Sequence, residues 1–496
     1  MSKMTRREFT ASALAAAATG GAAALLAACQ TTKGYRPQTP ASTWSKVIGA
    51  NEDVRVAVVG FHSKGKTHID GFRKMKGVRV VALCDVDSKV LDKEVKKFTD
   101  RNEKVAAYRD IRELLDDPNV DAVVTATPNH WHALVTVWAC QAGKDVYVEK
   151  PACHEIWEGI KQVEAARKYK RVVQVGTQHH SDQGLKEAFE WIHAGNLGKI
   201  LVARGLCYKP RESIGKVSGP QPIPPEIDYN LWAGPAPMVP LMRKRLHYDW
   251  HWFWLTGNGD IGNQGIHEMD LARWALGATE TSPRTISIGG RFGYDDDGQT
   301  PNTHIVFQDY KPAPLIFEVR GLPVKAGSKV MPAYKGIRIG NVIHCEGGYF
   351  AGGWAYDNKG EKIKQFKLDG GKAHRSNFIE AVRSRKWETL NSDIQQGHLS
   401  ATLVHSGNIS HRLGKEASQG EIMEKIKAEK DAVETFERLK EHLAANEIDL
   451  DKSKATLGPW LAMDTKQLVF TGPFAAEANK LRKRDYRKPF EIPEQV

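Results

Sequence analysis

The hydrophobic positions that follow residue 53 fall into an alternating order of strand and helix. Four continuous apolar runs rich in β-branched residues are typical of strands buried on both faces: residues 54–60, 78–85, 120–127 and 145–150. More polar segments with helical spacing separate these runs. Strands and helices that alternate across short turns predict βαβ units. We therefore expect an α/β fold that begins with a doubly wound parallel sheet over residues 53–175.

A different pattern begins near residue 176. A helix is expected at about residues 183–194, and the apolar runs that follow predict strands at 199–208, 284–293, 304–310, 314–321 and 336–348. Residues 357–360, Asp-Asn-Lys-Gly, are typical of a hairpin turn, which joins antiparallel neighbours. We therefore expect a second domain over residues 176–415 whose sheet is mostly antiparallel.

Beyond residue 415 the chain is highly charged, with one apolar stripe. The stripe recurs at helical spacing and consists of Val433, Phe436, Leu439 and Leu443. Residues 450–496 show no catalytic pattern. We expect residues 416–496 to form a helical extension that packs on one of the domains or on a neighbouring subunit.

The first 29 residues have the pattern of an export signal. Arg6 and Arg7 precede an apolar stretch over residues 11–28, and Cys29 follows small residues. A membrane anchor helix is the alternative, but the stretch is mostly Ala and Gly, which are weakly apolar. Leu-Ala-Ala-Cys resembles a bacterial lipobox, in which Cys29 carries a lipid anchor; simple cleavage nearby is the alternative. Lipidation of Cys29 and simple cleavage both predict an exported, periplasmic protein. Residues 30–52 are then expected to form a linker arm.

Charge and cysteine content narrow the classes of partner. The net charge is +12, which raises the question of an anionic partner. Lysines and arginines are spread along the chain among acids, and no zinc-finger or basic-helix pattern occurs, so we expect no nucleic-acid partner. The cysteines after Cys29 lie mostly inside apolar runs, which predicts buried thiols rather than a disulfide framework. We expect no metal site.

The loop after the first predicted strand carries a candidate phosphate-binding turn, which reads Gly60, Phe61, His62, Ser63, Lys64 and Gly65. In GxGxxG loops the glycines permit a tight turn and let the backbone approach a pyrophosphate at a helix N-terminus. His62 replaces the second glycine. A glycine that simply ends a strand is the alternative interpretation, but the strand before and the helix after favour a dinucleotide site.

Asp85 ends the second predicted strand, 25 residues after Gly60. An acid near this spacing accepts hydrogen bonds from the ribose hydroxyls of a dinucleotide and repels a 2′-phosphate. The alternative is that Asp85 only caps the next turn. Together with the loop, Asp85 predicts NAD rather than NADP as the cofactor.

Two further strands of the same sheet end in polar residues. Thr127, Asn129 and His132 follow the strand at 120–127, and Glu149-Lys150-Pro151 follows the strand at 145–150. Ligands of such sheets bind at the carboxyl ends of the strands. The Lys150 ammonium can stabilise a developing alkoxide and pass a proton, although a surface turn is the alternative for such a tripeptide.

The ordered set of motifs resembles the Gfo/Idh/MocA oxidoreductases. The segments that carry the resemblance lie within residues 53–415 and are VAVVGFHSKG, ALCDVD, ATPNHWHA, VEKP, VGTQHHS and GNGDIGNQGIHEMDLARWALG. The resemblance implies a Rossmann domain followed by an α/β domain with a large open, mostly antiparallel sheet. It also implies that Lys150 contacts the reacting hydroxyl, that Glu149 holds the nicotinamide-side ribose and that Gln178 lies near the cofactor.

The resemblance further implies that His267 is the candidate base, with an acid four residues earlier. In this chain that position is Asn263. A histidine suits proton abstraction near neutral pH, whereas a satisfied structural histidine is the alternative. His179, Asn263 and Asp270 are expected near the substrate.

An aromatic segment lies just before these residues. It contains Trp250, Trp252 and Trp254 beside His251 and Phe253. About half of these rings should form core and the others could stack on a sugar. We select Trp252 as a substrate contact.

Three hypotheses about function follow. The first is an exported NAD-dependent oxidoreductase that acts on a hydroxyl of a sugar, glycoside or polyol, with Lys150 and His267 as acid and base. The second is an NAD-assisted glycoside hydrolase, and the third is a sugar-binding lipoprotein without catalysis. An exported enzyme must load NAD before it leaves the cytoplasm, and the twin-arginine route carries folded proteins. By analogy with the family, a homo-oligomer is expected.

Overall fold

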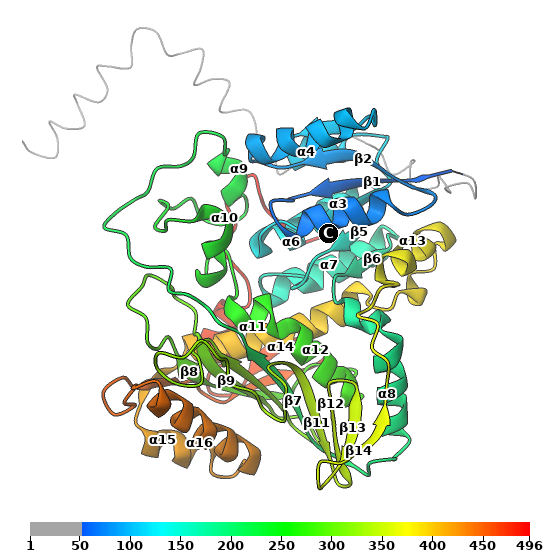
Figure 1. The fold of residues 1–496 in the computed structure, drawn as a ribbon. Coiled ribbons are helices and arrows are strands. Elements are labelled where there is room, and N and C mark those ends of the chain that lie inside the picture. The colour runs from blue at the N-terminus through cyan, green and yellow to red at the C-terminus, as the bar shows by residue number, and fades with distance from the viewer. Residues whose placement is uncertain (1–51) are drawn as a thin grey trace, which may run out of the picture.

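The computed structural model describes residues 52–496. The expected export signal with Cys29, and the arm up to residue 51, lie outside the described residues. Figure 1 shows a parallel α/β domain, drawn in blue and cyan, above a second domain built on a large curved sheet. In the described part of the chain no helix is both long and apolar enough to span a membrane.

The parallel sheet of the first domain has the order β3-β2-β1-β4-β5-β6. Its strands are β1 (Val54–Val59), β2 (Val78–Cys84), β3 (Ala106–Tyr108), β4 (Ala122–Thr125), β5 (Asp145–Val148) and β6 (Val173–Val175). The helices between them are α3 (Lys64–Arg73), α4 (Ser88–Asp100), α5 (Ile111–Leu115), α6 (Asn129–Gln141) and α7 (Ile156–Lys168). The order reverses between β1 and β4, which is where ligands of doubly wound sheets bind.

Both faces of this sheet are buried, and β1 shows why the sequence of such a strand is mostly apolar. Successive side chains of a strand point to opposite faces. Val54, Val56 and Val58 pack in one core with α3 and α4. Ala57 and Val59 pack in another core with α6. Helices on both faces therefore leave Arg55, which pairs with Asp121 at 2.7 Å, as the one polar side chain of the strand.

The second domain contains a sheet of twelve strands within residues 52–496. Its order is β14-β13-β12-β11-β7-β10-β9-β8-β16-β15, with β17 also paired to β8 and β18 paired to β17. The strands are β7 (Ile200–Tyr208), β8 (Arg284–Gly290), β9 (Thr303–Gln308), β10 (Leu315–Arg320), β11 (Ile339–Cys345), β12 (Gly348–Ala351), β13 (Trp354–Asp357), β14 (Lys362–Gln365), β15 (Lys415–Ala417), β16 (Ala455–Leu457), β17 (Leu461–Asp464) and β18 (Val469–Thr471). The pairs are antiparallel except for β10 with β7, so the predicted fold class is confirmed.

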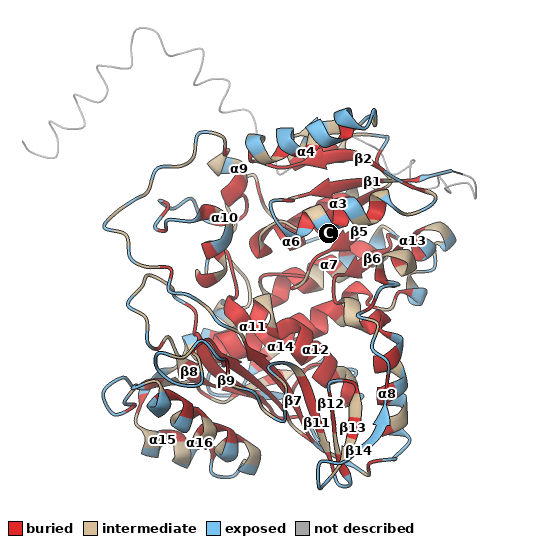
Figure 2. Ribbon diagram, viewed as in Figure 1, coloured by how far each residue is buried: buried red, intermediate tan, exposed pale blue. Residues whose placement is uncertain are grey.

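Helices cover both faces of the large sheet. On the face toward the first domain lie α11 (Gly259–Asn263), α12 (Gly265–Ala275) and α14 (Ile394–Arg412), and the opposite face of β8–β10 carries α15 (Gln419–Ile426) and α16 (Lys430–Ala445) (Figure 1). The central strands are accordingly buried, as the red colouring in Figure 2 shows. The apolar stripe predicted from the sequence explains the contact between α16 and the sheet, because Phe436, Leu439 and Leu443 are fully buried there.

The extension over residues 416–496 differs from the expected helical segment, because it also contributes strands. β15 and β16 extend the sheet at β8, and β17 pairs with β18 and with β8. These strands have only three or four residues, too few to show a period in the sequence. A short helix, α17 (Ala475–Lys480), follows, and the chain then returns to the first domain (Figure 1).

A long insert, residues 209–258, leaves the sheet after β7 and passes beside the carboxyl ends of the parallel strands. It contains only α9 (Tyr229–Ala233), α10 (Leu246–Asp249) and the 3₁₀ turn η3 (Trp250–Trp252). The insert contacts the loop after β2, because the Ser88 amide donates to the Glu226 carbonyl at 3.0 Å and His247 lies 2.8 Å from the Asp87 carboxylate. The insert therefore forms one wall of the site described next.

Candidate active site

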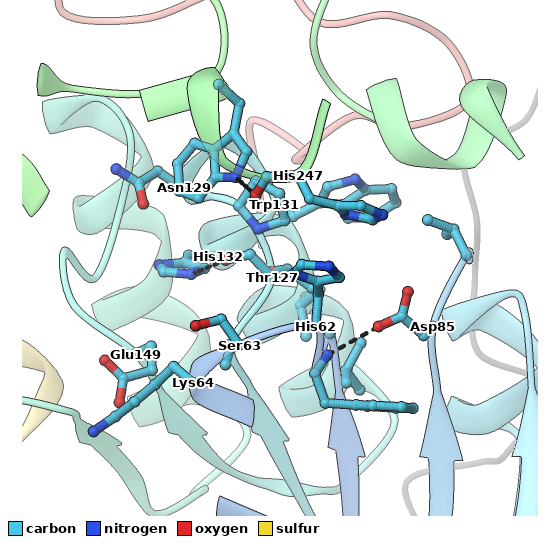
Figure 3. A pocket seen from close by; sticks show the side chains of 18 of the residues that line it. His62, Ser63, Lys64, Asp85, Thr127, Asn129, Trp131, His132, Glu149 and His247 are labelled. Atoms are coloured by element: carbon cyan, nitrogen blue, oxygen red, sulfur yellow. Dashed lines mark hydrogen bonds between the residues drawn. The ribbon is translucent and has the colours of Figure 1, made fainter. Parts of the chain in front are cut away.

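A cavity of about 360 Å³ lies between the carboxyl ends of the parallel strands and the insert. Its lining brings together most of the residues selected from the sequence: Gly60, His62, Ser63, Lys64, Asp85, Thr127, Asn129, His132, Glu149, Lys150, Gln178, Asn263 and His267. Figure 3 shows how side chains from the loops and helix starts that follow β1, β2, β4 and β5 surround this space together with His247 of the insert. The volume falls in the range of small-molecule and cofactor sites.

The turn after β1 needs glycine at two positions. Gly60 has a φ of +71°, and a Cβ placed there would lie 2.8 Å from the Thr127 Cα. A Cβ on Gly65 would lie 2.3 Å from the Gly60 carbonyl oxygen, so Gly65 packs behind the turn and not in the cavity lining. Both glycines let the N-terminus of α3 approach β1 closely, as a dinucleotide turn requires.

The N-terminus of α3 faces the cavity without a side-chain cap. Ser63 occupies the N-cap position, yet its hydroxyl makes no capping hydrogen bond. The helix N-terminus is therefore available to an anion. His62, in place of the second motif glycine, stacks on His247 of the insert with ring centroids 4.1 Å apart (Figure 3). The replaced position thus connects the turn to the insert.

Asp85 is fixed at the end of β2 by backbone hydrogen bonds. Its carboxylate accepts the Phe61 amide at 2.9 Å and the Asp87 amide at 3.1 Å, and the first of these bonds is drawn in Figure 3. Burial raises the pKa of Asp85, while these two amides oppose the shift. Each carboxylate oxygen keeps a further lone pair for a ribose hydroxyl.

The loops after β4 and β5 are joined by His132. Its ring nitrogens face two carbonyl oxygens, that of Pro151 at 2.6 Å and that of Thr127 at 2.8 Å. Asn129 extends the connection to the second domain, because its amide donates to the Asn258 side chain at 2.9 Å. These residues therefore position the cavity edge as well as lining it.

Glu149 is held as a carboxylate at the end of β5. His68 of α3 donates from Nε2 to Oε1 of Glu149 at 2.8 Å, and both side chains are buried. Burial opposes the charge, but the His68 hydrogen bond and the nearby Lys150 outweigh it and lower the pKa of Glu149. An ionised, fixed carboxylate can accept hydrogen bonds from ribose hydroxyls.

Lys150 contributes an amine to the cavity lining. Its Nζ donates to the backbone carbonyl of Asn263 at 2.5 Å. Lys150 therefore contacts position 263, where the family resemblance implied an acid, through the main chain and not through the side chain. Burial lowers the pKa of Lys150, and the Glu149 charge opposes that shift. A lysine with a lowered pKa can exchange a proton closer to neutral pH than a free lysine.

His267 lies in the first turn of α12, where it lines the cavity, and its imidazole is kept neutral. Burial and the nearby Lys150 lower its pKa well below the ordinary histidine value. Its Nδ1 is buried without a hydrogen-bond partner among the described residues, and its ring meets that of His179 edge-on at 5.7 Å. A neutral imidazole is the form that accepts a proton.

Some selected residues lie outside the cavity lining. Asp270 is buried against His180 at 2.8 Å and accepts from Ser400 at 2.5 Å. His179 lies behind His267, and Trp252 is buried under Arg211, whose guanidinium carbon is 5.2 Å from the ring centroid. The tertiary partners of these residues come from distant parts of the chain, so local sequence could not indicate them.

Other aromatic residues of the insert do line the cavity. They were not selected from the sequence and are Trp232, Tyr248, Trp250 and His251, together with the aliphatic Leu231 of the insert and Trp131 of α6. Trp250 and His251 are stacked with centroids 3.6 Å apart. The density of aromatic residues in the sequence indicated that this segment could contact a substrate. Which of its rings faces the cavity is determined by the 3₁₀ turn η3, which the sequence did not show.

These residues fit NAD. The glycine turn, the uncapped N-terminus of α3 and the buried carboxylate of Asp85 would hold the pyrophosphate and the adenosine ribose. Glu149 would hold the second ribose. Lys150 and His267 then lie in the same cavity, where proton transfer would accompany the hydride chemistry that a nicotinamide supplies.

Comparison with known protein families decides the class. Residues 54–177 match the Gfo/Idh/MocA oxidoreductase family, NAD-binding Rossmann fold, and residues 199–312 match the C-terminal alpha/beta domain of the same oxidoreductase family. The chain belongs to the Gfo/Idh/MocA family. Its first domain is an NAD-binding Rossmann domain, so the predicted cofactor and the predicted class of enzyme, an NAD-dependent oxidoreductase, are confirmed.

Individual relatives of this Gfo/Idh/MocA protein match only part of the chain. Inositol 2-dehydrogenase/D-chiro-inositol 3-dehydrogenase of Lacticaseibacillus casei is 26% identical over 248 residues, which is 49% of this chain and 68% of the relative. Glycosyl hydrolase family 109 protein 2 of Shewanella sp. (strain ANA-3) is 32% identical over 181 residues, which is 34% of this chain and 39% of the relative. The second match therefore spans well under half of that hydrolase.

Solved structures show the same fold. The WlbA dehydrogenase from Bordetella pertussis, in complex with NADH and UDP-GlcNAcA, superimposes with a TM-score of 0.54 at 18% identity, over 72% of this chain and 97% of that one. GenD2 from gentamicin A biosynthesis, in complex with NAD, gives a TM-score of 0.53 at 18% identity, over 75% and 96%. At 18% sequence identity, the similarity to these structures shows a shared fold and nothing more specific.

Proposed function

We propose that the protein acts on a hydroxyl of a sugar, glycoside or polyol with NAD as the hydride acceptor or donor. The observation that carries the proposal is the meeting of two proton-transfer groups, Lys150 and His267, with the dinucleotide residues in one cavity. A relative named as an inositol dehydrogenase supports this substrate class, and a dehydrogenase of the same fold was crystallised with UDP-GlcNAcA.

The protein's own groups would divide the work as follows. Oxidation of a carbinol removes a hydride from carbon, which NAD accepts, and a proton from oxygen. Neutral His267 is suited to take that proton. Lys150 would donate a hydrogen bond to the oxygen as negative charge develops on it, and the Asn263 carbonyl keeps the amine in place. In reduction the same groups return the proton.

The substrate contacts form a separate part of the proposal. Trp250 and His251 are better placed than Trp252 to contact a sugar ring, because they line the cavity. Aromatic faces pack against the apolar faces of sugars. His179 and Asp270 would act through their neighbours, since His179 supports His267 and Asp270 is paired with His180.

We also propose export by the twin-arginine route, with Cys29 as the site of a lipid anchor. The support is the sequence of residues 1–29. NAD is not freely supplied outside the cytoplasm, so the protein would be exported with its cofactor already bound. The nucleotide would then have to be recycled in place, through a second substrate, a redox-neutral reaction or another electron acceptor.

A second candidate is an NAD-assisted glycoside hydrolase. The Shewanella relatives named as glycosyl hydrolase family 109 proteins favour it, with identities of up to 32%. In such a cycle a sugar hydroxyl would be oxidised, the aglycone would leave by elimination, water would add to the unsaturated sugar, and the hydride would be returned. This reaction is redox-neutral and suits a cofactor that stays bound.

The first experiment measures the nucleotide that copurifies with the protein. Protein purified without added cofactor is denatured, and released NAD, NADH and NADP are separated by chromatography. We expect close to one NAD(H) per chain. No nucleotide, and no binding of added NAD, would exclude both enzymatic functions and leave the sugar-binding lipoprotein.

Activity then separates the two enzymes. Net NADH formation with sugars or polyols supports the oxidoreductase, and release of the leaving group from aryl glycosides without net NADH supports the hydrolase. Lys150→Met keeps the apolar stem and removes the amine, so we expect turnover to fall by at least about a hundredfold. Lys93→Met is the control, because Lys93 is exposed on α4. Wild-type turnover in Lys150→Met would contradict the proposed role.

A further inference from the structure

Residues 482–496 return from the second domain and lie against the outside of the cavity wall. Figure 1 shows this segment, in red, passing between the insert at α9 and the helices of the first domain. The Trp157 amide donates to the Arg482 carbonyl at 3.0 Å, so the segment starts on α7. Phe490, Ile492 and Val496 are buried in the core that contains α6. The segment is therefore anchored at its start on α7 and again near its end in this core.

Arg487 holds the short helix α9. Its guanidinium donates to the side chain of Asn230 at 2.7 Å, to the Asn230 carbonyl at 2.7 Å and to the Gly234 carbonyl at 3.1 Å. A helix of five residues has no stability of its own. Arg487 satisfies its terminal carbonyls and so fixes the stretch that carries Leu231 and Trp232 into the cavity.

Phe490 supports the same wall through Trp131. The Phe490 ring meets the Trp131 ring edge-on at 5.5 Å. The Trp131 indole N–H in turn donates to the carbonyls of Leu231 at 3.1 Å and Trp232 at 3.0 Å. Close packing continues at Gly234, where a Cβ would lie 2.2 Å from the Trp131 ring. A continuous contact therefore runs from Phe490 to the cavity surface.

Arg484 anchors the segment in a buried ionic cluster. Its Nε lies 3.2 Å from the Glu155 carboxylate and 3.4 Å from that of Glu158, and its Nη2 donates to the Leu255 carbonyl at 3.3 Å. Tyr486 adds a hydrogen bond from its hydroxyl to Glu158 at 3.1 Å. Buried carboxylates are costly without a counter-charge, so this contact ties the segment firmly to α7 and to the end of the insert.

We propose that residues 482–496 form a brace that keeps the α9 wall closed over the dinucleotide cavity and thereby slows the release of NAD. The proposal rests on the binding of NAD in this cavity. Arg487 and Phe490 are positioning residues, because they reach the cavity only through Asn230, Gly234 and Trp131. A brace of this kind gives a physical reason why a cofactor would remain bound where it cannot be replaced.

The test compares Arg487→Ala with Lys488→Ala. Lys488 is the neighbouring residue, carries the same charge and is exposed. NADH is bound to each protein and then displaced by excess NAD, and its dissociation rate is followed by fluorescence. We expect Arg487→Ala to release NADH about tenfold faster or more, because three hydrogen bonds to the wall are lost. We expect Lys488→Ala to stay within about twofold of wild type.

A second measurement does not depend on the nucleotide. Hydrogen exchange of the amides in residues 229–235 should become faster in nucleotide-free Arg487→Ala, while that of β1 stays unchanged. Should Arg487→Ala fold poorly, Arg487→Lys is used, since the compact ammonium keeps the charge but lacks the planar fork that places three nitrogens of Arg487 on separate acceptors.

Release of NADH at the wild-type rate, or unchanged exchange in residues 229–235, would overturn the brace. Wild-type protein that retained no nucleotide on purification and bound no added NADH would contradict the proposed function and leave the brace without a cofactor to retain. The exchange measurement would then still report whether this segment orders the α9 wall. The two failures are therefore distinguishable.

Discussion

Single side chains around the cavity are held in defined protonation states by their neighbours. Glu149 is ionised beside His68, Lys150 has a lowered pKa, and His267 is neutral. Glu268, the residue after His267, is different. It is buried, its Oε1 accepts from Gln264 at 3.0 Å, and its Oε2 has no partner among the described residues.

The Glu268 carboxyl leads to a prediction about pH. Burial raises its pKa to about 8, so the folded protein holds a proton there that the unfolded chain releases near pH 4.3. The stability from this group is therefore present at low pH and is lost as the pH rises towards about 8. In Glu268→Gln we expect the free energy of unfolding to fall less between about pH 5 and pH 8.5 than in wild type.

Urea unfolding at several pH values checks this expectation. Glu380→Gln is the matched control, because Glu380 is exposed and its substitution should leave the pH dependence unchanged. A decline in Glu268→Gln as steep as that of wild type would show that Glu268 does not carry the buried proton.

At the scale of elements, the strand–turn–helix unit of β1 and α3 determines the dinucleotide site. Its positive φ at Gly60 and the contact with Thr127 make this turn intolerant of a side chain. In Gly60→Ala we expect the affinity for NADH to fall by about tenfold or more, because the turn must shift away from β4. Fluorescence titration measures the change.

Gly420→Ala is the control for Gly60→Ala. Gly420 lies in α15, and no atom lies within 4 Å of a Cβ placed there. Alanine in this helix should be neutral or should stabilise the protein by up to about 1 kcal/mol. Equal affinities for NADH in wild type and Gly60→Ala would contradict the assignment of this turn to the cofactor.

The same elements show what the sequence could predict. The runs at 54–60 and 78–85 indicated buried parallel strands because both faces are covered, and Asp85 followed from its spacing. The partner of Asp270 could not be predicted, since His180 and Ser400 approach it only after folding. The apolar stripe through Phe436 was visible, but the break between α15 and α16 was not.

At the scale of the whole molecule, α15 and α16 cover the outer face of β8–β10. Charged residues reinforce the contact, because Glu318 of β10 is fully buried and paired with Arg438 of α16 at 2.7 Å. A second copy stacking on this sheet could therefore reach only the part on β11–β14. The expected homo-oligomer stays a prediction, and this is where its interface would lie.

Phe436 should matter for stability and not for the cofactor. It is fully buried in the core between α16 and the sheet. We expect Phe436→Ala to lower the free energy of unfolding by about 3–5 kcal/mol while the NADH affinity stays close to wild type. Urea unfolding and NADH titration measure the two quantities. Val433→Ala, at a half-buried position of the same helix, should cost less, and a loss of affinity in Phe436→Ala would show unexpected coupling.

The position of the brace in the chain has a consequence for biosynthesis. Arg487 lies 257 residues after Asn230, which it holds, so the ribosome makes it after the Rossmann turn, the insert and the large sheet. A nascent chain that has completed its first domain still lacks the support for α9. Lasting capture of NAD would therefore wait until translation has passed residue 490, and chains truncated before that point would lose the nucleotide readily.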